Sequence, residues 1–214
     1  MAGNRLKVPV STSRRGVLVG VAATLFAASG SAQPGAQAQD AAAGQVESMR
    51  GEAFAERTNA RRTLAPAADV FVGDLVQTNE QSGLVLKLGS TTTVKLGGEA
   101  RFRIDRFVVG AGGTLDLERG PVVIDRDDRA RKENLQVRSP FGLIAVRGTM
   151  FFAGPSDGVF GVFVGRGAVS VSAGGRTVTL RPGHGTNIAS PGAPPSDPKS
   201  WGEQRIKAAL ASVG

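Results

Sequence analysis

The chain has 214 residues, with 26 Lys or Arg, 18 Asp or Glu and no Cys, and its formal net charge is +8. The first 38 residues hold four basic and no acidic residues, so the remainder carries a net charge of only +4. This balance argues against a one-signed nucleic-acid-binding surface. Without disulfides the fold depends on its hydrophobic core, and the length after residue 38 suffices for one domain of ordinary size.

The N-terminus has the order of an export signal. Basic residues precede an uncharged apolar run over residues 17–28, and small residues follow it. The run of twelve residues is too short to span a bilayer, which takes about 20 apolar residues. The stretch "AQA" fits a cleavage site, with the cut between Ala38 and Gln39, and a second possible site follows Ala32. Residues 1–38 are therefore predicted to be an export signal peptide.

The stretch "SRRGVLV" resembles the twin-arginine export motif. Arg14 and Arg15 are the residues that the export receptor reads, whereas Val17 and Val19 replace the usual Phe and Lys. The alternatives are a general secretory signal that contains two arginines, or an uncleaved anchor. The predicted location is periplasmic or secreted, after export by a bacterium.

Short alternating strands follow the signal. In "GLVLKLG", "ARFRIDRF" and "TVTLRPG" apolar residues alternate with polar ones, and Gly, Pro, Asn or Asp bound the runs. Such period-two patterns indicate half-buried strands. We expect residues 39–68 to form a lead-in and a first strand, and residues 69–190 to form a β domain with about ten strands. The predicted fold class is all-β.

A weak internal sequence repeat does not decide how the strands are arranged. "RGPVVI" begins at Arg119 and "RGAVSV" begins at Arg166, and each has a Gly turn before an alternating strand. A repeat of this kind is typical of solenoid-like stacking. Any two strands after a Gly turn look alike, so a stacked β-roll and a sandwich both remain possible.

Residues 191–214 are predicted to be a Pro-rich linker and a short helix. The stretch "PGAPPSDPKS" holds four of the eleven prolines and is not expected to join a sheet. Ser196 or Asp197 is expected to cap the helix, with Pro198 in its first turn. Its apolar face, which includes Trp201, either docks on the β domain or binds a partner, and docking is favoured.

An ordered set of motifs resembles the FecR-type periplasmic domain. The pieces are "VFVGDLVQTNEQSGLVLKLGSTTTVKLG", "GTLDLERGPVVI", "LQVRSPFGLIAVRGTMFFA", "GVFVGRGAVSV" and "VTLRPGHGTNI". The most specific element is "VRGT", residues 146–149. The resemblance covers about residues 69–188.

The resemblance implies a sensing role. The best-known members are anti-sigma regulators of iron uptake, in which a cytoplasmic domain and one membrane helix precede this periplasmic domain. Only some 16 residues precede the short apolar run here, so we expect no sigma-binding domain. The expected function is the sensing or binding half alone, in a free periplasmic module.

The family-motif residues are expected to be structural. Gly73 and Asp74 suit a turn, because Gly adopts positive φ and Asp bonds nearby backbone. Gly148 lets a strand bend or another backbone approach. Arg147 pins that turn or anchors a partner. The remaining family-motif residues are Thr149 and Gly167.

Catalytic or metal chemistry finds little support. The chain has no Cys, and its single His184 lies between two glycines in an expected turn. The stretch "DRDD" is not followed by the Gly and Glu of an EF-hand loop at their required spacing. The whole charge run "DRDDRARKE" is interpreted as a solvated loop. We therefore expect no enzyme activity, no cofactor and no metal.

Three functions remain as hypotheses. The favoured one is a non-enzymatic periplasmic module that binds another envelope protein, such as a receptor or a signalling protein. The alternative is a cell-wall or carbohydrate-binding module, against which the scarcity of aromatic residues counts. The third is a hydrolase of unrecognised type. Neither nucleic acid nor a stable membrane span is expected, and the sequence leaves the partner, any link to iron and the oligomeric state open.

Overall fold

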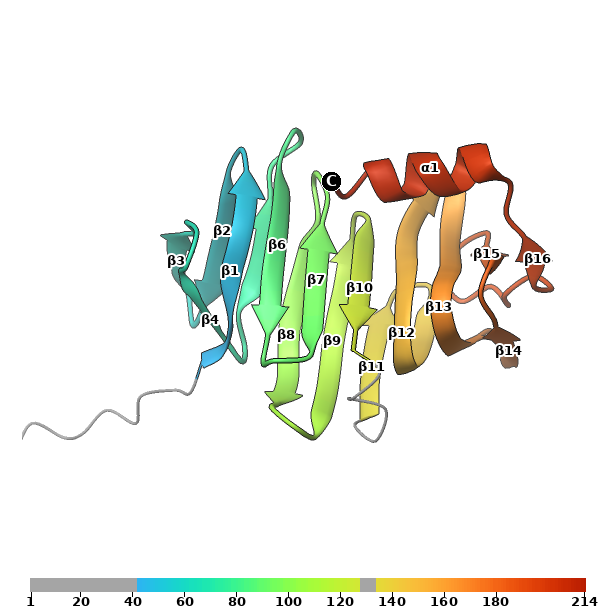
Figure 1. Cartoon of the computed structure of the whole chain (residues 1–214), viewed down its shortest axis with the longest axis horizontal. Coiled ribbons are helices and arrows are strands. Elements are labelled where there is room, and N and C mark those ends of the chain that lie inside the picture. Colours follow the sequence, from blue (N-terminus) through green and yellow to red (C-terminus); the bar gives the residue numbers. More distant parts are fainter. Residues whose placement is uncertain (1–41, 128–133) are drawn as a thin grey trace, which may run out of the picture. The chain divides into compact units, whose positions relative to one another are not determined.

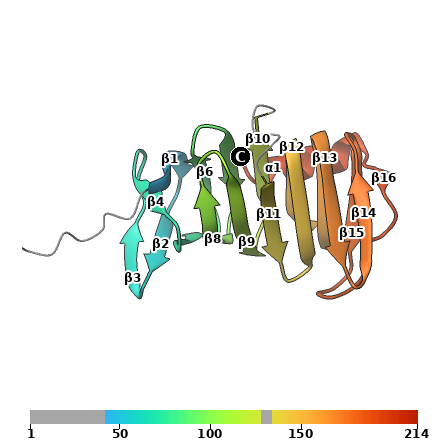
Figure 2. The same ribbon diagram turned by 90° about the horizontal axis from the view of Figure 1, so that it is seen from below.

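Sixteen strands of the described residues hydrogen-bond into one continuous, folded-over sheet (Figures 1 and 2). A computed structural model describes residues 42–127 and 134–214. The predicted export motif at Arg14 and Arg15 and the predicted cleavage between Ala38 and Gln39 lie outside these residues. The all-β prediction with a short C-terminal helix is confirmed.

The sheet consists of two facing rows of strands that meet at β12 (Gly142–Ser156) and β13 (Val159–Ala173). The first row is, in spatial order, β3 (Ala60–Thr63), β2 (Ala53–Arg57), β5 (Leu75–Thr78), β8 (Arg101–Val108), β9 (Gly112–Arg119) and β11 (Asn134–Ser139). The second row is β4 (Asp69–Phe71), β1 (Ala42–Arg50), β6 (Gly83–Leu88), β7 (Thr92–Leu96) and β10 (Val122–Arg126). Neighbours are antiparallel except β9 and β11, which are parallel.

Successive hairpins alternate between the two rows. The hairpin β6–β7 lies in the second row and the hairpin β8–β9 lies in the first. The sequence left open whether the strands stack like a solenoid or face each other in a sandwich. The structure combines the two, because hairpins that follow one another along the chain build opposite layers of one sheet.

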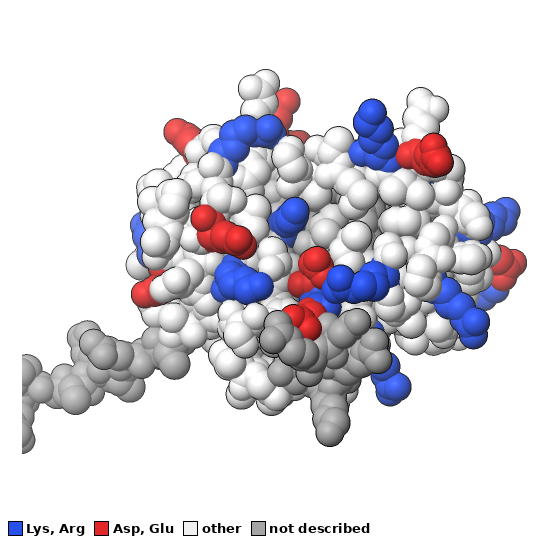
Figure 3. All heavy atoms as spheres, in the orientation of Figure 1, with Lys and Arg blue, Asp and Glu red and all other residues white. Residues whose placement is uncertain are grey.

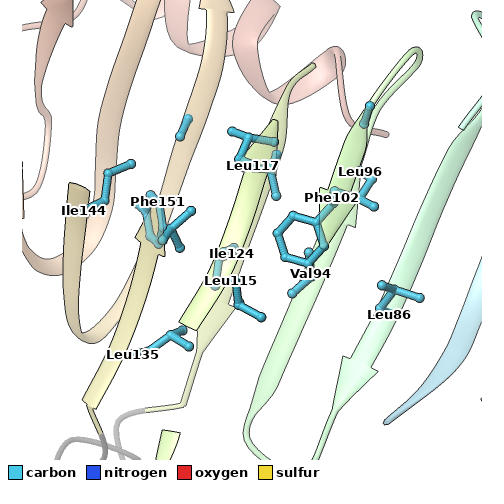
Figure 4. Close-up of a cluster of buried hydrophobic side chains, with 14 of the residues drawn as sticks. Leu86, Val94, Leu96, Phe102, Leu115, Leu117, Ile124, Leu135, Ile144 and Phe151 are labelled. Atoms are coloured by element: carbon cyan, nitrogen blue, oxygen red, sulfur yellow. The ribbon is translucent and has the colours of Figure 1, made fainter. Parts of the chain in front are cut away.

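The core fills the space between the rows (Figure 4). Each strand contributes one face: Leu84, Leu86 and Leu88 of β6 are buried, while Lys87 between them is only half-buried. Phe102 of β8 and Phe151 of β12 have no exposed surface. Burial of a large apolar side chain is worth roughly 1.5–3 kcal/mol, so this alternation explains how a chain without disulfides stays folded.

The longest strands, β12 and β13, pass from one row into the other. The first half of β12 pairs with β11 up to Val146, and its second half pairs with β10 from Met150. Strand β13 mirrors it, because its second half pairs with β14 (Arg176–Leu180) and its first half pairs with β15 (His184–Ile188). The two strands pair with each other along almost their whole length and therefore hold the rows together.

The C-terminal helix α1 (Glu203–Ala211) docks on the outer face of the second row, as the sequence favoured. Trp201 and Ala209 are buried against Phe152 and Phe163, and Trp201 stacks on Phe163 with ring centroids 5.3 Å apart. Arg205 lies over the Trp201 ring at 3.7 Å. No helix among the described residues has the length and apolarity needed to cross a bilayer.

Two details of the predicted C-terminal segment are wrong. The helix begins after Gly202, which provides no side-chain cap, while Ser196 accepts a hydrogen bond from the Asn187 amide and Asp197 pairs with Arg176. The linker also joins the sheet, since Lys199–Ser200 forms strand β16 beside β15. The prolines stop at residue 198, so the last two residues of the linker are free to pair.

Two further stretches differ from the sequence expectation. Residues 42–63 form three strands of the sheet where one was expected, and β1 pairs with β4 and β6. The charge run is no loop at its start: Asp125 and Arg126 belong to β10, and Arg126 is fully buried. The alternation of apolar and polar residues that marks a strand cannot be recognised when a charged side chain, here that of Arg126, occupies an inward position. Residues 128–133 of the run lie outside the described residues.

Candidate interaction surface

The "VRGT" motif lies where β12 crosses between the rows. The pairing register of β12 with β13 shifts between Arg147 and Met150, and Gly148 has φ of +48°. The Thr149 hydroxyl donates a hydrogen bond to the carbonyl oxygen of Arg166 on β13. A bulge increases local bending and twist, so this register shift fits the passage of the strand from one row to the other.

Gly167 faces this crossing from β13. Its φ is +79°, and a Cβ atom built on it would lie 2.3 Å from the carbonyl oxygen of Gly148. No side chain fits there, and positive φ disfavours any residue with a Cβ. The two glycines thus allow the backbones of β12 and β13 to touch where both strands bend.

The Gly73–Asp74 pair forms a second tight turn, between β4 and β5. The buried Asp74 carboxylate accepts a hydrogen bond of 2.8 Å from the Phe71 amide and one of 2.6 Å from the Arg62 guanidinium. Arg57 lies 3.7 Å from the same carboxylate, and both arginines lie over the Phe71 ring. The side chain therefore ties β2, β3 and β4 together, which is a structural role.

Arg147 does not make the contacts expected of a residue that holds the turn in place. Its side chain is exposed and forms no hydrogen bond or ion pair with any residue in the described ranges. The turn is instead held by Thr149 and by the glycine contact. Arg147 is therefore free to meet a group from another molecule.

A shallow groove extends from Arg147 across the outer face of β12, β13 and β14, next to β11 of the first row. Small side chains from β12, β13 and β14 line its floor and sides: Ala145, Ala168, Ser170 and Thr179. Gln136 of β11 lies beside Ala145 in the pairing register. The inward-pointing residues between them, such as Val146 and Val169, belong to the core, so the groove is a stable part of the sheet.

Beside the groove the sheet ends at β14, which pairs only with β13 (Figure 2). The strand reads "RTVTL", and its first residue, Arg176, pairs with Asp197. The remaining four residues are uncharged, and three of them are β-branched. An uncharged, β-branched sheet edge is a ready template for another strand.

Comparison with known proteins identifies the central part of this sheet. The sequence model of the family described as FecR protein matches residues 74–170. Residues 74–170 form a FecR domain. It begins at the buried carboxylate of the β4–β5 turn and ends on β13 inside the groove, so the sheet extends beyond it on both sides.

Solved structures share the fold of a large part of this chain. Two crystal structures of a proposed anti-sigma factor from Parabacteroides distasonis, at 1.65 and 2.50 Å resolution, match with TM-scores of 0.53 and 18% sequence identity. The match covers 64% of this chain and 64% and 63% of the two other chains, respectively. At this identity the likeness concerns the fold. No curated protein matches the sequence.

Cross-strand ion pairs cover the rest of the outer face of the first row. Arg138 of β11 binds Asp116 of β9 through two hydrogen bonds of 2.6 and 2.8 Å, and it lies 2.9 Å from Asp105 of β8. The hydrogen bonds and charge of Asp116, more than those of Asp105, raise the pKa of Arg138 above its ordinary value. Arg138 therefore already has two carboxylate partners, in contrast to Arg147.

The opposite face also mixes its charges. On the part visible in Figure 3, basic side chains are interspersed with acidic ones. Arg166, for example, binds Asp125 at 2.8 Å. A surface of this kind lacks the one-signed character of nucleic-acid-binding surfaces.

The candidate residues for chemistry are scattered. His184 lies at the start of β15, where Nδ1 is 3.2 Å from the carbonyl oxygen of Pro182 in its own turn. Over the described ranges, no three His, Cys, Asp or Glu side chains gather closely enough to hold a metal ion. The single Trp201 is buried under the C-terminal helix, so it presents no platform for a sugar ring.

The sequence revealed only part of this surface. Gly73, Asp74, Gly148, Thr149 and Gly167 were recognised by their motifs, and the structure places the last three together at the crossing. The groove was missed, because small outward residues carry no chemical signal of their own. The only available sign was the stretch "AVSVSA", in which the polar positions of an alternating strand are all small.

Proposed function

We propose that the chain is an exported, non-enzymatic module that binds another protein of the bacterial envelope and takes part in signalling. The FecR domain over residues 74–170 carries this proposal. The fold shared with a proposed anti-sigma factor supports a regulatory role over a catalytic one. In this account the sheet is a rigid support and the outer face near β12–β14 provides the contact.

Export is the second part of the proposal. The arginine pair, the short apolar run and the small residues after it support transport by the twin-arginine route, with cleavage before Gln39. The partner is then a protein exposed to the periplasm, such as a receptor or a signalling protein.

The experiment that tests the proposal is a crosslinking capture from living cells. The full-length chain with a C-terminal tag is expressed at its natural level, crosslinked and identified with its partners by mass spectrometry. The matched control is the same chain with Phe151→Ala, which removes a fully buried core side chain and so weakens the fold. We expect one envelope protein to be enriched with the native chain over the control. Enrichment of none would contradict the proposal.

Cell-wall binding is tested separately with the purified chain. The purified chain is mixed with purified peptidoglycan and sedimented, with the peptidoglycan-free sample as control. We expect the chain to remain in the supernatant, because its only Trp is buried. Co-sedimentation that saturates with added peptidoglycan would favour a cell-wall-binding module instead.

A further inference from the structure

The free edge of β14 can be assigned its hydrogen-bonding groups. A two-residue turn, Gly174–Gly175, closes the β13–β14 hairpin with Ala173 opposite Arg176. In such a hairpin the closing pair exchanges hydrogen bonds and every second pair repeats this. The amide and carbonyl groups of Arg176, Val178 and Leu180 therefore bond to β13, and those of Thr177 and Thr179 point away from the sheet.

The other strand ends of the sheet are less available. Strand β3 has four residues and carries Arg61 and Arg62, β4 has three residues, and β16 has two. Charged and very short edges discourage strand addition. Among the described edges, β14 alone joins an uncharged centre to a long neighbouring strand.

We propose that a partner protein adds an extended segment to β14 and places an acidic side chain over the groove, against Arg147. This inference rests on the proposed function and names the surface and the kind of partner. Backbone groups of Thr177 and Thr179 would hold the added strand, as in other cases of β-strand addition. The small residues Ala145, Ala168 and Ser170 leave room for the partner's body next to the added strand.

The charge of Arg147 favours a different protein over a second copy of this chain. Two copies paired edge to edge at β14 would lie side by side in one sheet, and both grooves would stay uncovered. Each Arg147 would then still lack a carboxylate. The contact would also involve only a few residues on each side, well below the roughly 1,200 Å² that stable interfaces bury.

The test is site-specific photocrosslinking in cells with the full-length chain. The photoreactive residue p-benzoylphenylalanine replaces Thr177 on the β14 edge or, as the matched control, Thr63 on the opposite edge strand β3. Both threonines are exposed. We expect a crosslink to one other protein from position 177 and none to that protein from position 63.

Two pairs of variants make the test specific. Thr179→Pro removes an outward-pointing N–H without removing a hydrogen bond to β13, whereas Thr179→Val keeps the N–H. Arg147→Glu reverses the charge, whereas Arg147→Lys keeps it. We expect Thr179→Pro and Arg147→Glu each to lower the crosslink yield about tenfold and the two control variants to retain most of it. Circular dichroism confirms that all four remain folded.

Every other outcome overturns the inference. A crosslink to a second copy of the chain, or to the chain's own N-terminal segment, would assign the edge to that occupant. A crosslink that Thr179→Pro leaves unchanged would show that strand addition is not the mode of binding. If the whole-chain capture recovers a partner but position 177 does not reach it, the proposed function stands and the β14 site fails. If neither experiment recovers a partner, both proposals fail.

Discussion

At the scale of single residues, two small sites explain why the sheet can fold over on itself. Gly148 and Gly167 let two strands touch at the crossing, and Asp74 fastens the first strands to one another. Both sites occur in the stretches that identify the FecR domain. We interpret these residues as determinants of the fold. Arg147, which precedes Gly148, is instead available for binding.

Gly167→Ala should destabilise the protein strongly. The new Cβ would combine a φ of +79° with a contact of 2.3 Å to backbone, so we expect a loss of about 3 kcal/mol in the free energy of unfolding. Gly158→Ala is the matched control, because its φ is +74° and no atom lies within 4 Å. It should cost only about 1 kcal/mol. Urea unfolding measures both, and equal losses would show that the crossing is not tightly packed.

Asp74→Asn should also lower stability. It removes the charge of a fully buried carboxylate that pairs with two partly exposed arginines, and losing a charge-assisted hydrogen bond of this kind costs about 2 kcal/mol. The control is Glu118→Gln, whose half-exposed carboxylate pairs with Arg101 and Arg103. Exposed pairs contribute below about 1 kcal/mol. Thermal unfolding of the two variants should therefore differ clearly, and a larger effect from Glu118→Gln would contradict this view.

At the scale of elements, the helix and the two long strands behave as one unit. Strands β12 and β13 link the rows, and α1 covers the outer face of the second row just where these strands lie (Figure 1). The sole Trp of the chain lies under this helix. Its fluorescence therefore reports on helix docking, while circular dichroism reports on the sheet.

We expect the two signals to change together during unfolding, because helix and sheet share one apolar cluster. The variant Leu210→Ala should shift both transitions to lower urea concentration, since Leu210 packs against that cluster. The exposed Lys207→Ala on the same helix should leave them in place. An early fluorescence change in the native chain would show that the helix undocks by itself.

Sequence patterns predicted the elements better than their arrangement. Period-two alternation such as Leu84, Leu86 and Leu88 marks a strand and its buried face, because both are local properties. The crossing of β12 was not predictable from alternation, since its two halves look like one strand in sequence. The helix cap was misjudged at Ser196 because tertiary hydrogen bonds with Asn187 compete with local capping.

At the scale of the whole molecule, the proposed function combines a predicted export signal with a FecR domain that is proposed to bind a partner. The signal supports transport, the FecR domain supports a regulatory role, and the edge of β14 with its groove offers a surface for a partner. None of these features requires catalysis. Substitution of the arginine pair tests whether the protein is exported.

Replacement of both Arg14 and Arg15 by Lys should block export by the twin-arginine route, because the receptor reads the arginine pair. We expect the variant to accumulate in the cytoplasm with its signal uncut, while Arg5→Lys is exported normally. Cell fractionation and intact-mass measurement report both results, and the exported chain should begin at Gln39. Unchanged export of the double variant would favour a general secretory signal.

Binding of this domain to one envelope protein is tested most directly by a titration of the purified chain with the protein recovered by in-cell capture. We predict saturable binding with one partner per chain, weakened about tenfold by Thr179→Pro and unchanged by Thr179→Val. Binding that does not saturate, or the failure of any envelope protein to bind the purified chain, would contradict the account.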